Sequence, residues 1–140
     1  MSNKSSDESR EGLRLLALDG GGIRGLSELV ILGEIMDRIK ATDNLPDTPR
    51  PCEYFDLIGG TSTGGLIAIM LGRLGMTVQE AIEAYTKFAG HVFTEKKWAV
   101  QDGTFKATRL QEAIQEIVEK HAGSENARMR DDPPLTRCKT

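Results

Sequence analysis

One serine in a glycine-rich segment is the strongest candidate for chemistry in this chain. Residues 60–64 read Gly-Thr-Ser-Thr-Gly, which fits the pattern G-x-S-x-G, and they lie between a strand-like run and an apolar, helix-like run. In that context the pattern is typical of a tight strand-to-helix turn, which exposes the serine hydroxyl and leaves room only for small neighbours. The pattern therefore predicts Ser62 as the nucleophile of an acyl-transfer reaction. The turn around it comprises Gly60, Thr61, Thr63 and Gly64.

The helix that starts at this serine strengthens the catalytic interpretation. Unpaired N–H groups at a helix N-terminus, together with the helix dipole, stabilise negative charge that develops nearby. The alternative interpretation is an ordinary polar turn with no chemistry. The strand before the motif and the apolar helix after it favour the catalytic interpretation.

A second glycine-rich segment, LDGGGIRGL at residues 18–26, has two possible functions. Its Gly20, Gly22 and Gly25 fit G-x-G-x-x-G, the pattern of dinucleotide-binding loops. Such a site also needs an acidic residue at the end of a second strand, about 20 residues further on. That distance leads to Asp43 in a proline-rich loop, and the Gly-Lys-Ser/Thr signature of phosphate-binding loops is missing. Nucleotide binding therefore ranks last, and no cofactor is expected.

The other possible function of this loop is to supply backbone donors to a developing oxyanion. Three consecutive glycines let the backbone come within about 3 Å of such an oxygen. We therefore expect Gly20, Gly21 and Gly22 to form an oxyanion hole beside the serine. Arg24, with Gly25 after it, is placed to meet an anionic group of the substrate.

The periodicity of apolar residues predicts the elements that position these two segments. A continuous apolar run over 13–18 predicts a strand that ends at the first glycine cluster, and helical spacing over 26–39 predicts the helix after it. A second strand over 54–58 leads into the serine motif. The helix that follows, over 66–74, is apolar nearly all round, so it should be buried and end at Gly75.

Two further helices carry the capping-box pattern at their predicted starts. The pattern occurs at Thr77–Glu80 and again at Thr108–Gln111. Apolar residues at helical spacing follow each start: Val78, Ala81, Ile82, Tyr85, Phe88 and Ala89 in one helix, and Leu110, Ala113, Ile114, Ile117 and Val118 in the other. Residues 41–53 contain three prolines and are predicted to form a loop.

The number of predicted strands bears on the extent of the domain. Two strands against four helices are too few for a parallel sheet covered on both faces, and the tail at Cys138 to Thr140 ends where a further strand would be expected. We therefore expect residues 13–140 to be part of a longer α/β domain. A polar, disordered tail is expected over 1–12.

The composition indicates a soluble globular domain. Of the 140 residues, 39% are hydrophobic and 28% charged, and the formal net charge of -3 gives no general attraction to nucleic acid. No signal peptide is recognisable, and the apolar runs fall short of the roughly 20 residues of a membrane span, so we expect a cytoplasmic protein with peripheral membrane contact at most. Cys52 and Cys138 are far apart in sequence and fit neither a disulfide framework nor a zinc site, and no metal is expected.

Taken together, LDGGGIRGL and IGGTSTGG, about forty residues apart, resemble the N-terminal part of a patatin-like phospholipase domain. The resemblance implies a three-layer α/β/α sandwich and hydrolysis of lipid acyl esters by a Ser-Asp dyad, without a histidine. It implies a membrane lipid or glycerolipid as substrate. It also implies that Ser62 is the nucleophile, that the backbone of Gly20, Gly21 and Gly22 forms the oxyanion hole, and that Arg24 is the basic residue of that loop.

The dyad aspartate of the family has no counterpart in these residues. It lies in an Asp-Gly-Gly or Asp-Gly-Ala motif downstream of the serine, and neither motif follows Ser62. Asp102, before Gly103 and Thr104, comes nearest but does not match, and Asp19 belongs to the oxyanion loop. We therefore expect one half of an active site, nearly inactive by itself. The alternative is a non-catalytic patatin-like module that serves binding or regulation in a larger protein.

A few other residues could be given a function but have a simpler interpretation. His91 and His121 are expected to be packing or surface residues, because the family uses no histidine. Trp98 beside Lys96 and Lys97 has a composition that suits a lipid interface, but ordinary packing is the preferred interpretation.

Overall fold

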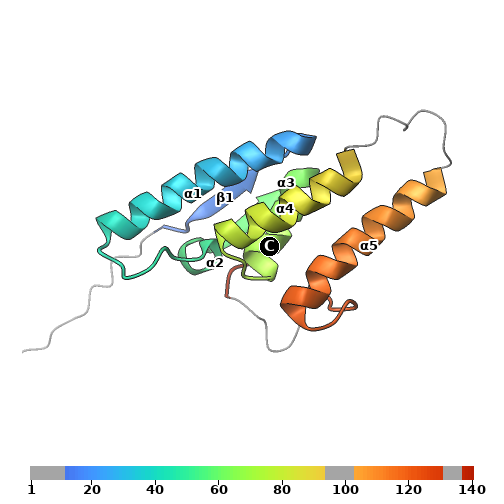
Figure 1. The fold of residues 1–140 in the computed structure, drawn as a ribbon. Helices are drawn as coiled ribbons and strands as arrows, with labels where there is room; N and C mark the ends of the chain where they lie inside the picture. Colours follow the sequence, from blue (N-terminus) through green and yellow to red (C-terminus); the bar gives the residue numbers. More distant parts are fainter. Residues whose placement is uncertain (1–11, 94–102, 131–136) are drawn as a thin grey trace, which may run out of the picture.

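A small parallel sheet and five α-helices form the α/β fold of this chain in the computed structural model, which describes residues 12–93, 103–130 and 137–140 (Figure 1). Strands β1 (Leu15–Leu18) and β2 (Leu57–Gly60) pair in parallel, with Leu15 opposite Leu57. The helical elements are η1 (Gly22–Arg24), α1 (Gly25–Thr42), α2 (Pro51–Tyr54), α3 (Thr63–Ala68), the π-helical turn η2 (Ile69–Arg73), α4 (Val78–Phe93) and α5 (Gly103–Ala122). Most of the predicted tail, residues 1–11, lies outside the described residues.

The two faces of the sheet differ in burial. Successive side chains of a strand point to opposite faces, and here Leu18 and Ile58 are buried while Leu15 and Leu57 are 62% and 41% exposed. Parallel sheets normally have both faces covered, so their strands are apolar on both sides. The described residues therefore cover one face of this sheet and leave the apolar side chains of the other face in contact with solvent.

The edge of β2 that faces away from β1 pairs with the last residues of the chain. Ile58 N–H donates to the carbonyl oxygen of Lys139 at 2.9 Å, and Lys139 N–H donates to that of Asp56 at 3.0 Å, which makes a parallel bridge between Leu57 and Lys139. A further strand was expected from about this point of the chain, and the described residues form one bridge there. The chain thus places β2 between β1 and its last residues.

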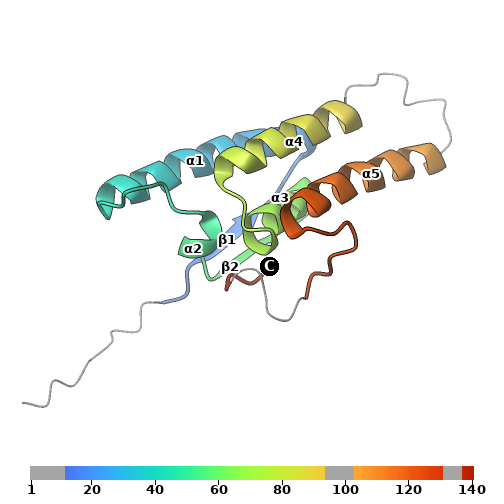
Figure 2. The same cartoon turned by 60° about the horizontal axis from the view of Figure 1, so that its bottom comes forward.

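Helices α1 and α4 lie side by side in both ribbon views and share the core with the buried face of the sheet (Figures 1 and 2). From α1, Leu29 and Met36 are fully buried, and from α4, Ala81 and Tyr85 are. Helix α5 packs along α4, and its described side chains are at most partly buried. The core therefore sits between the sheet, α1, α3 and α4, and α5 adds an outer layer beside α4.

The helix after the serine motif confirms the prediction of a buried, apolar helix. Its α-helical part, α3, starts directly after Ser62, earlier than the predicted residue 66, and it continues as the π-helical turn η2. Met76 N–H then donates to the carbonyl oxygen of Met70 at 3.0 Å, and Gly75, directly before Met76, has a φ of 64°. Gly75 therefore ends the helix as predicted, because a left-handed residue is easiest for glycine.

The start of the second strand was predicted wrongly. Residues 51–54 form the short helix α2 within the predicted loop, and β2 begins at Leu57 rather than at residue 54. Pro51 takes the first helical position, and Glu53 accepts a hydrogen bond from Arg50 N–H at 2.8 Å. The apolar Tyr-Phe pair continued the strand-like pattern of the sequence, but these local capping contacts set the helix instead.

One of the two predicted helix starts is confirmed and the other is wrong. At the start of α4, Thr77 N–H donates to Glu80 at 2.8 Å, and Glu80 N–H donates to the Thr77 hydroxyl at 3.1 Å. Thr108 was predicted to cap the last helix, but α5 already begins at Gly103. A capping pattern marks a start only where the preceding backbone leaves the helix, which the pattern alone does not encode.

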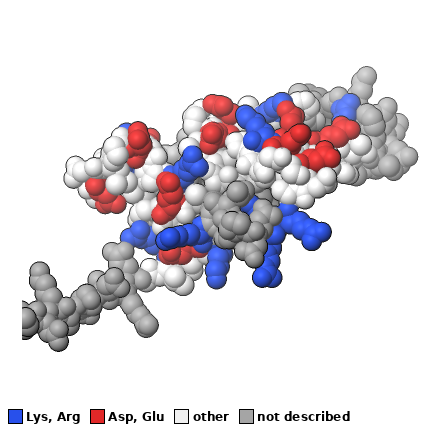
Figure 3. Space-filling view, turned by 90° about the horizontal axis from the view of Figure 1, so that it is seen from below, with Lys and Arg blue, Asp and Glu red and all other residues white. Residues whose placement is uncertain are grey.

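Acidic and basic side chains are unevenly distributed over the face of the molecule shown in Figure 3. Acidic side chains lie mostly in the upper part of that view, together with some basic ones, and basic side chains gather along its lower edge. The formal net charge of -3 is therefore not spread evenly over this face.

Candidate active site

Ser62 occupies a strained turn between β2 and α3. Its φ of 55° and ψ of -131° lie in a region that residues with a side chain rarely adopt. The residue lies directly before the N-terminus of α3, and its side chain makes no capping hydrogen bond to that helix. The sequence motif therefore folds as the strand-turn-helix that it predicted, with the hydroxyl not engaged in a cap.

The glycines on either side of the serine are required by space. A Cβ on Gly60 would lie 2.4 Å from the carbonyl carbon of Gly64, and a Cβ on Gly64 would lie 2.3 Å from the carbonyl oxygen of Leu18. Both contacts are with backbone atoms, which cannot move aside as the end of a flexible side chain can. The turn is thus closed tightly enough that only glycine fits at both positions.

The first glycine cluster packs directly against this turn. A Cβ on Gly20 would lie 2.6 Å from the backbone nitrogen of Gly64. Thr61 N–H donates to the carbonyl oxygen of Leu18 at 3.0 Å, and Gly22 N–H donates to the hydroxyl of Thr63 at 3.2 Å. The structure therefore brings together the two segments that the sequence singled out, and threonines of the serine motif hold the glycine loop.

At this junction the backbone N–H groups of Gly21 and Thr63 are among those that have no hydrogen-bond partner within the described residues. Gly20 N–H, by contrast, donates to Glu28 at 2.9 Å, and Gly22 N–H donates to Thr63. Gly20, Gly21 and Gly22 all have positive φ values, of 79°, 113° and 66°. The loop thus offers one free donor between two that are already engaged.

Tyr85 of α4 holds the glycine loop through a hydrogen bond. The sequence predicted this residue only as part of an apolar helix face. Its side chain is fully buried, and its hydroxyl donates to the carbonyl oxygen of Gly22 at 2.5 Å. A Cβ on Gly25 would lie 2.6 Å from the same hydroxyl oxygen, so glycine is needed there. The signal available in the sequence was the residue type, because a tyrosine on a buried face needs a partner for its hydroxyl.

Arg24 lies on the exposed side of the same loop. Its Nε donates to the carbonyl oxygen of Gly21 at 3.4 Å, and a Cβ on Gly21 would lie 3.5 Å from the same Nε. The guanidinium therefore lies against Gly21 of the glycine loop. A role in meeting a substrate anion stays a prediction.

The sequence matches the family model of patatin-like phospholipases over residues 16–138. The chain belongs to the patatin-like phospholipase family. The match includes both glycine segments and every described helix of the chain.

Several curated plant proteins are similar to this patatin-like chain. Phospholipase A I of Arabidopsis thaliana is 41% identical over 93 residues, which cover 66% of this chain and 6% of that protein. Patatin group M-3 of Solanum tuberosum is 32% identical over 115 residues, covering 76% and 30%, and Patatin-like protein 4 of Arabidopsis thaliana is 37% identical over 90 residues, covering 60% and 22%. The chain thus spans less than a third of the length of these relatives. No solved structure matches it significantly.

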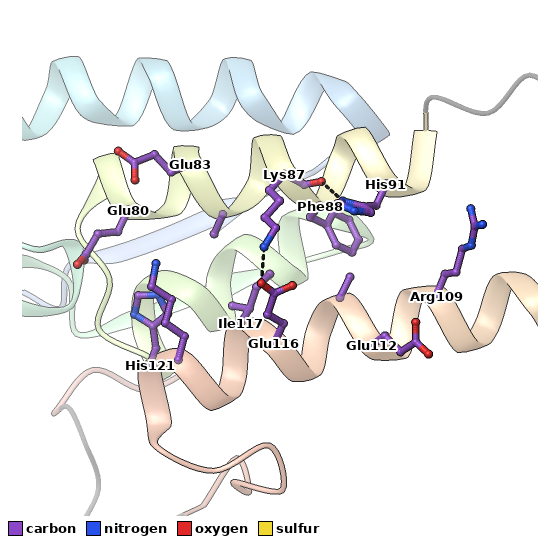
Figure 4. A pocket seen from close by; sticks show the side chains of 13 residues that line it. Glu80, Glu83, Lys87, Phe88, His91, Arg109, Glu112, Glu116, Ile117 and His121 are labelled. Atoms are coloured by element: carbon purple, nitrogen blue, oxygen red, sulfur yellow. Dashed lines mark hydrogen bonds and ion pairs between the residues drawn. The ribbon is translucent and has the colours of Figure 1, made fainter.

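Both histidines of this patatin-like chain lie in a groove between α4 and α5 (Figure 4). The groove has a volume of about 640 Å³, and its lining includes neither the glycine loop nor the serine turn. His91 Nδ1 lies 2.8 Å from the carbonyl oxygen of Lys87, and Lys87 pairs with Glu116 across the groove. Burial lowers the pKa of His121. Both histidines therefore lie among residues of α4 and α5, in a groove that does not include the serine turn.

The remaining candidates from the sequence are placed as follows. Cys52 and Cys138 form no disulfide, and burial raises the pKa of each thiol. Asp102, Trp98 and the two lysines before it lie outside the described residues. In the part of the chain that the structure describes, no group of three His, Cys, Asp or Glu side chains could hold a metal ion, and no helix has the length and apolar composition of a bilayer span.

Proposed function

We propose that this chain carries the nucleophile and the oxyanion hole of a serine lipid acyl hydrolase. The observation that carries the proposal is the strained Ser62 turn packed on a glycine loop, with unpaired N–H groups on both segments. Membership of the patatin-like phospholipase family and relatives named phospholipase and patatin support a lipid ester as the substrate. Membrane lipid or another glycerolipid, met through peripheral contact in the cytoplasm, is the substrate that we propose.

In the proposed reaction the Ser62 hydroxyl oxygen attacks the ester carbonyl carbon, and a base takes the hydroxyl proton. The carbonyl oxygen becomes an oxyanion that accepts hydrogen bonds from the N–H groups of Gly21 and Thr63. The alcohol part of the lipid then leaves with a proton, and an acyl-serine remains. Water hydrolyses this intermediate, which releases the fatty acid and restores the serine. The N–H groups of Gly20 and Gly22 are engaged in other hydrogen bonds, so they are not donors to the oxyanion. In this proposal these two glycines only shape the backbone of the hole.

The base in this proposal is the dyad aspartate of the family, located outside the 140 residues. No Asp-Gly-Gly or Asp-Gly-Ala motif follows Ser62 in the sequence. The apolar, solvent-exposed sheet face at Leu15 and Leu57 supports a third layer that completes an α/β/α sandwich. We therefore propose that the 140 residues alone turn over esters very slowly, since removing one member of a cooperating catalytic set costs most of the activity.

Covalent labelling tests the nucleophile directly. The longest protein that the gene encodes is treated with a fluorescent fluorophosphonate, beside its Ser62→Ala variant and a Ser27→Ala control. Ser27 is an exposed serine of α1, so it controls for nonspecific serine modification. We expect label on the wild type and on Ser27→Ala, and none on Ser62→Ala. Equal labelling of all three proteins contradicts the assignment of Ser62.

The second candidate function is a non-catalytic patatin-like module that binds lipid or regulates a larger protein. The missing aspartate motif is the observation that favours it. This function predicts no labelling of wild type at any reagent concentration and no esterase turnover on a short-chain nitrophenyl ester. Turnover by the 140-residue chain that is abolished by Ser62→Ala contradicts both this module and the proposed need for an external base.

A further inference from the structure

Glu28 connects helix α1 to the glycine loop. It lies in the first turn of α1, and its Oε1 accepts two hydrogen bonds, from Asp19 N–H at 3.1 Å and from Gly20 N–H at 2.9 Å. Its other oxygen, Oε2, is buried and has no hydrogen-bond partner within the described residues. One oxygen of this carboxylate therefore makes both of these loop contacts.

The loop needs such an anchor because of its composition. Gly20, Gly21 and Gly22 all adopt positive φ, a region that glycine enters freely and leaves just as freely. At Gly22 the loop is held on both sides, by Thr63 at its N–H and by Tyr85 at its carbonyl. At Gly20, Glu28 is the side chain that holds the N–H. The free N–H of Gly21 lies between these two fixed points.

We propose that Glu28 is a positioning residue, which fixes the direction of the Gly21 N–H by holding the N–H groups of Asp19 and Gly20. The inference rests on the proposed function, because it assigns the Gly21 N–H to the oxyanion. The inference also goes beyond that function. It states that a side chain of α1, which is distant in sequence from the serine turn, determines the shape of the oxyanion hole. A preorganised donor stabilises developing charge without reorganisation during the reaction.

A purely electrostatic role makes a different prediction. A carboxylate in the first turn of a helix interacts favourably with the helix dipole, and any acidic residue there would do so. Glutamine at position 28 distinguishes the two roles. Its amide oxygen can accept the same two N–H groups, and its NH₂ group takes the place of the oxygen that makes no hydrogen bond. Positioning therefore survives Glu28→Gln, whereas the dipole interaction does not.

The experiment compares wild type, Glu28→Ala, Glu28→Gln and a Glu34→Ala control in the full-length protein. Glu34 is an exposed residue of the same helix that pairs with Arg38. Amide hydrogen exchange is measured at Asp19 and Gly20, with Thr61 N–H, which is bonded to Leu18, as internal reference. The rate of Ser62 labelling by a fluorophosphonate is measured on the same samples.

We expect Glu28→Ala to speed exchange at Asp19 and Gly20 about tenfold relative to Thr61, and to slow labelling of Ser62 about tenfold, a fraction of the loss caused by deleting an oxyanion donor. Glu28→Gln and Glu34→Ala should match wild type in both measurements. Unchanged exchange in Glu28→Ala overturns the proposal, and so does fast exchange with labelling at the wild-type rate. Equal damage from Ala and Gln also overturns it.

The failure of the proposed function has a separate signature. If wild type is not labelled at all, the assignment of Ser62 as nucleophile is wrong. Exchange at Asp19 and Gly20 then still decides whether Glu28 holds the loop, because that measurement needs no reaction at the serine.

Discussion

Ser62 keeps a backbone conformation that glycine would hold more easily. A non-glycine residue in such a region costs on the order of 1–3 kcal/mol, which the surrounding structure must offset. The surroundings here are the close contacts of Gly60 and Gly64 with neighbouring backbone. The strain is thus maintained by the packing of the residues on either side of Ser62.

Replacing the serine by glycine should therefore stabilise the protein while removing the proposed nucleophile. Ser62→Gly relieves the strain but adds about 0.4–1 kcal/mol of chain entropy to the unfolded state, so we expect the free energy of unfolding to rise by about 1 kcal/mol. Urea denaturation measures this change. Ser62→Ala is the matched control, since alanine keeps the Cβ and the strain. Equal stability of the two variants would show that Ser62 is not strained.

The contact between the serine turn and β1 is a property of two elements rather than of one residue. Because a Cβ on Gly64 would lie 2.3 Å from the Leu18 carbonyl oxygen, Gly64→Ala must push α3 away from the end of β1. We expect a loss of about 3 kcal/mol in the free energy of unfolding, at the upper end of overpacking effects.

Gly90→Ala is the control for that prediction. Gly90 lies in α4 with open space around its Cα, so alanine there should stabilise the helix by up to about 1 kcal/mol. Thermal unfolding of the two variants should thus shift in opposite directions. A Gly64→Ala variant as stable as wild type would mean that the turn and β1 are not in close contact.

The cap of α4 makes the stability of that helix depend on pH. The hydrogen bond from Thr77 N–H is the main cause of a lowered pKa of the Glu80 carboxyl. A lowered folded-state pKa means that the carboxylate stabilises the fold above its ordinary pKa of 4.5, and that this contribution is lost as the pH falls through the lowered value.

Glu80→Gln should therefore reduce the stability at neutral pH and flatten its decline below pH 4.5, the ordinary value of this carboxyl. Cap replacements cost typically about 1 kcal/mol. Urea unfolding at a series of pH values measures both effects. Glu83→Gln, an exposed position on the same helix outside the cap, serves as control. Parallel pH profiles of wild type and Glu80→Gln would contradict the prediction.

At the scale of the whole molecule, one face of the sheet carries exposed apolar side chains in the part of the chain that the structure describes. Leu15 and Leu57 lie opposite each other on that face, and both are exposed. Exposed apolar patches on a sheet favour association. We expect the isolated 140-residue chain to form oligomers as its concentration rises, and Leu15→Thr with Leu57→Thr to shift it toward monomer.

Sedimentation velocity over a range of concentrations checks this expectation. Met129→Thr is the control, because Met129 is 54% exposed but lies outside the sheet. If both variants associate as wild type does, the open face does not drive association.

The parts of the structure that the sequence predicted are those with a local cause. The strand before the first glycine cluster, the buried helix after Ser62 and the Thr77–Glu80 cap each follow from a short pattern of residues. The starts of β2 and α5 were not predicted. Helix α2, with a proline at its first position, occupies the residues just before β2, and α5 begins before its capping pattern. Local patterns set the type of an element more firmly than its ends.

The candidate site shows the same division. The serine motif predicted the Ser62 turn, and the three consecutive glycines predicted the loop, but no pattern in the sequence singled out Glu28. Its bonds to Asp19 and Gly20 depend on how α1 leaves the loop, and Tyr85 reaches Gly22 only because α4 packs beside α1. Supporting contacts of this kind are tertiary, so no pattern within one segment contains them.

The docking of the glycine loop on the serine turn also has a consequence for how the protein folds. The two segments are joined by long-range contacts, such as the hydrogen bond from Gly22 N–H to the hydroxyl of Thr63, 41 residues apart in the chain. Neither segment can form these contacts before the other has reached its place. The chain loses conformational entropy when a loop of that length closes, and the contact compensates for this loss only once it has formed. We therefore expect the junction to form in the slow, non-local part of folding. A nascent or partly unfolded chain therefore has no preorganised Ser62 turn, and formation of the proposed active site is linked to completion of the β1–β2 pairing.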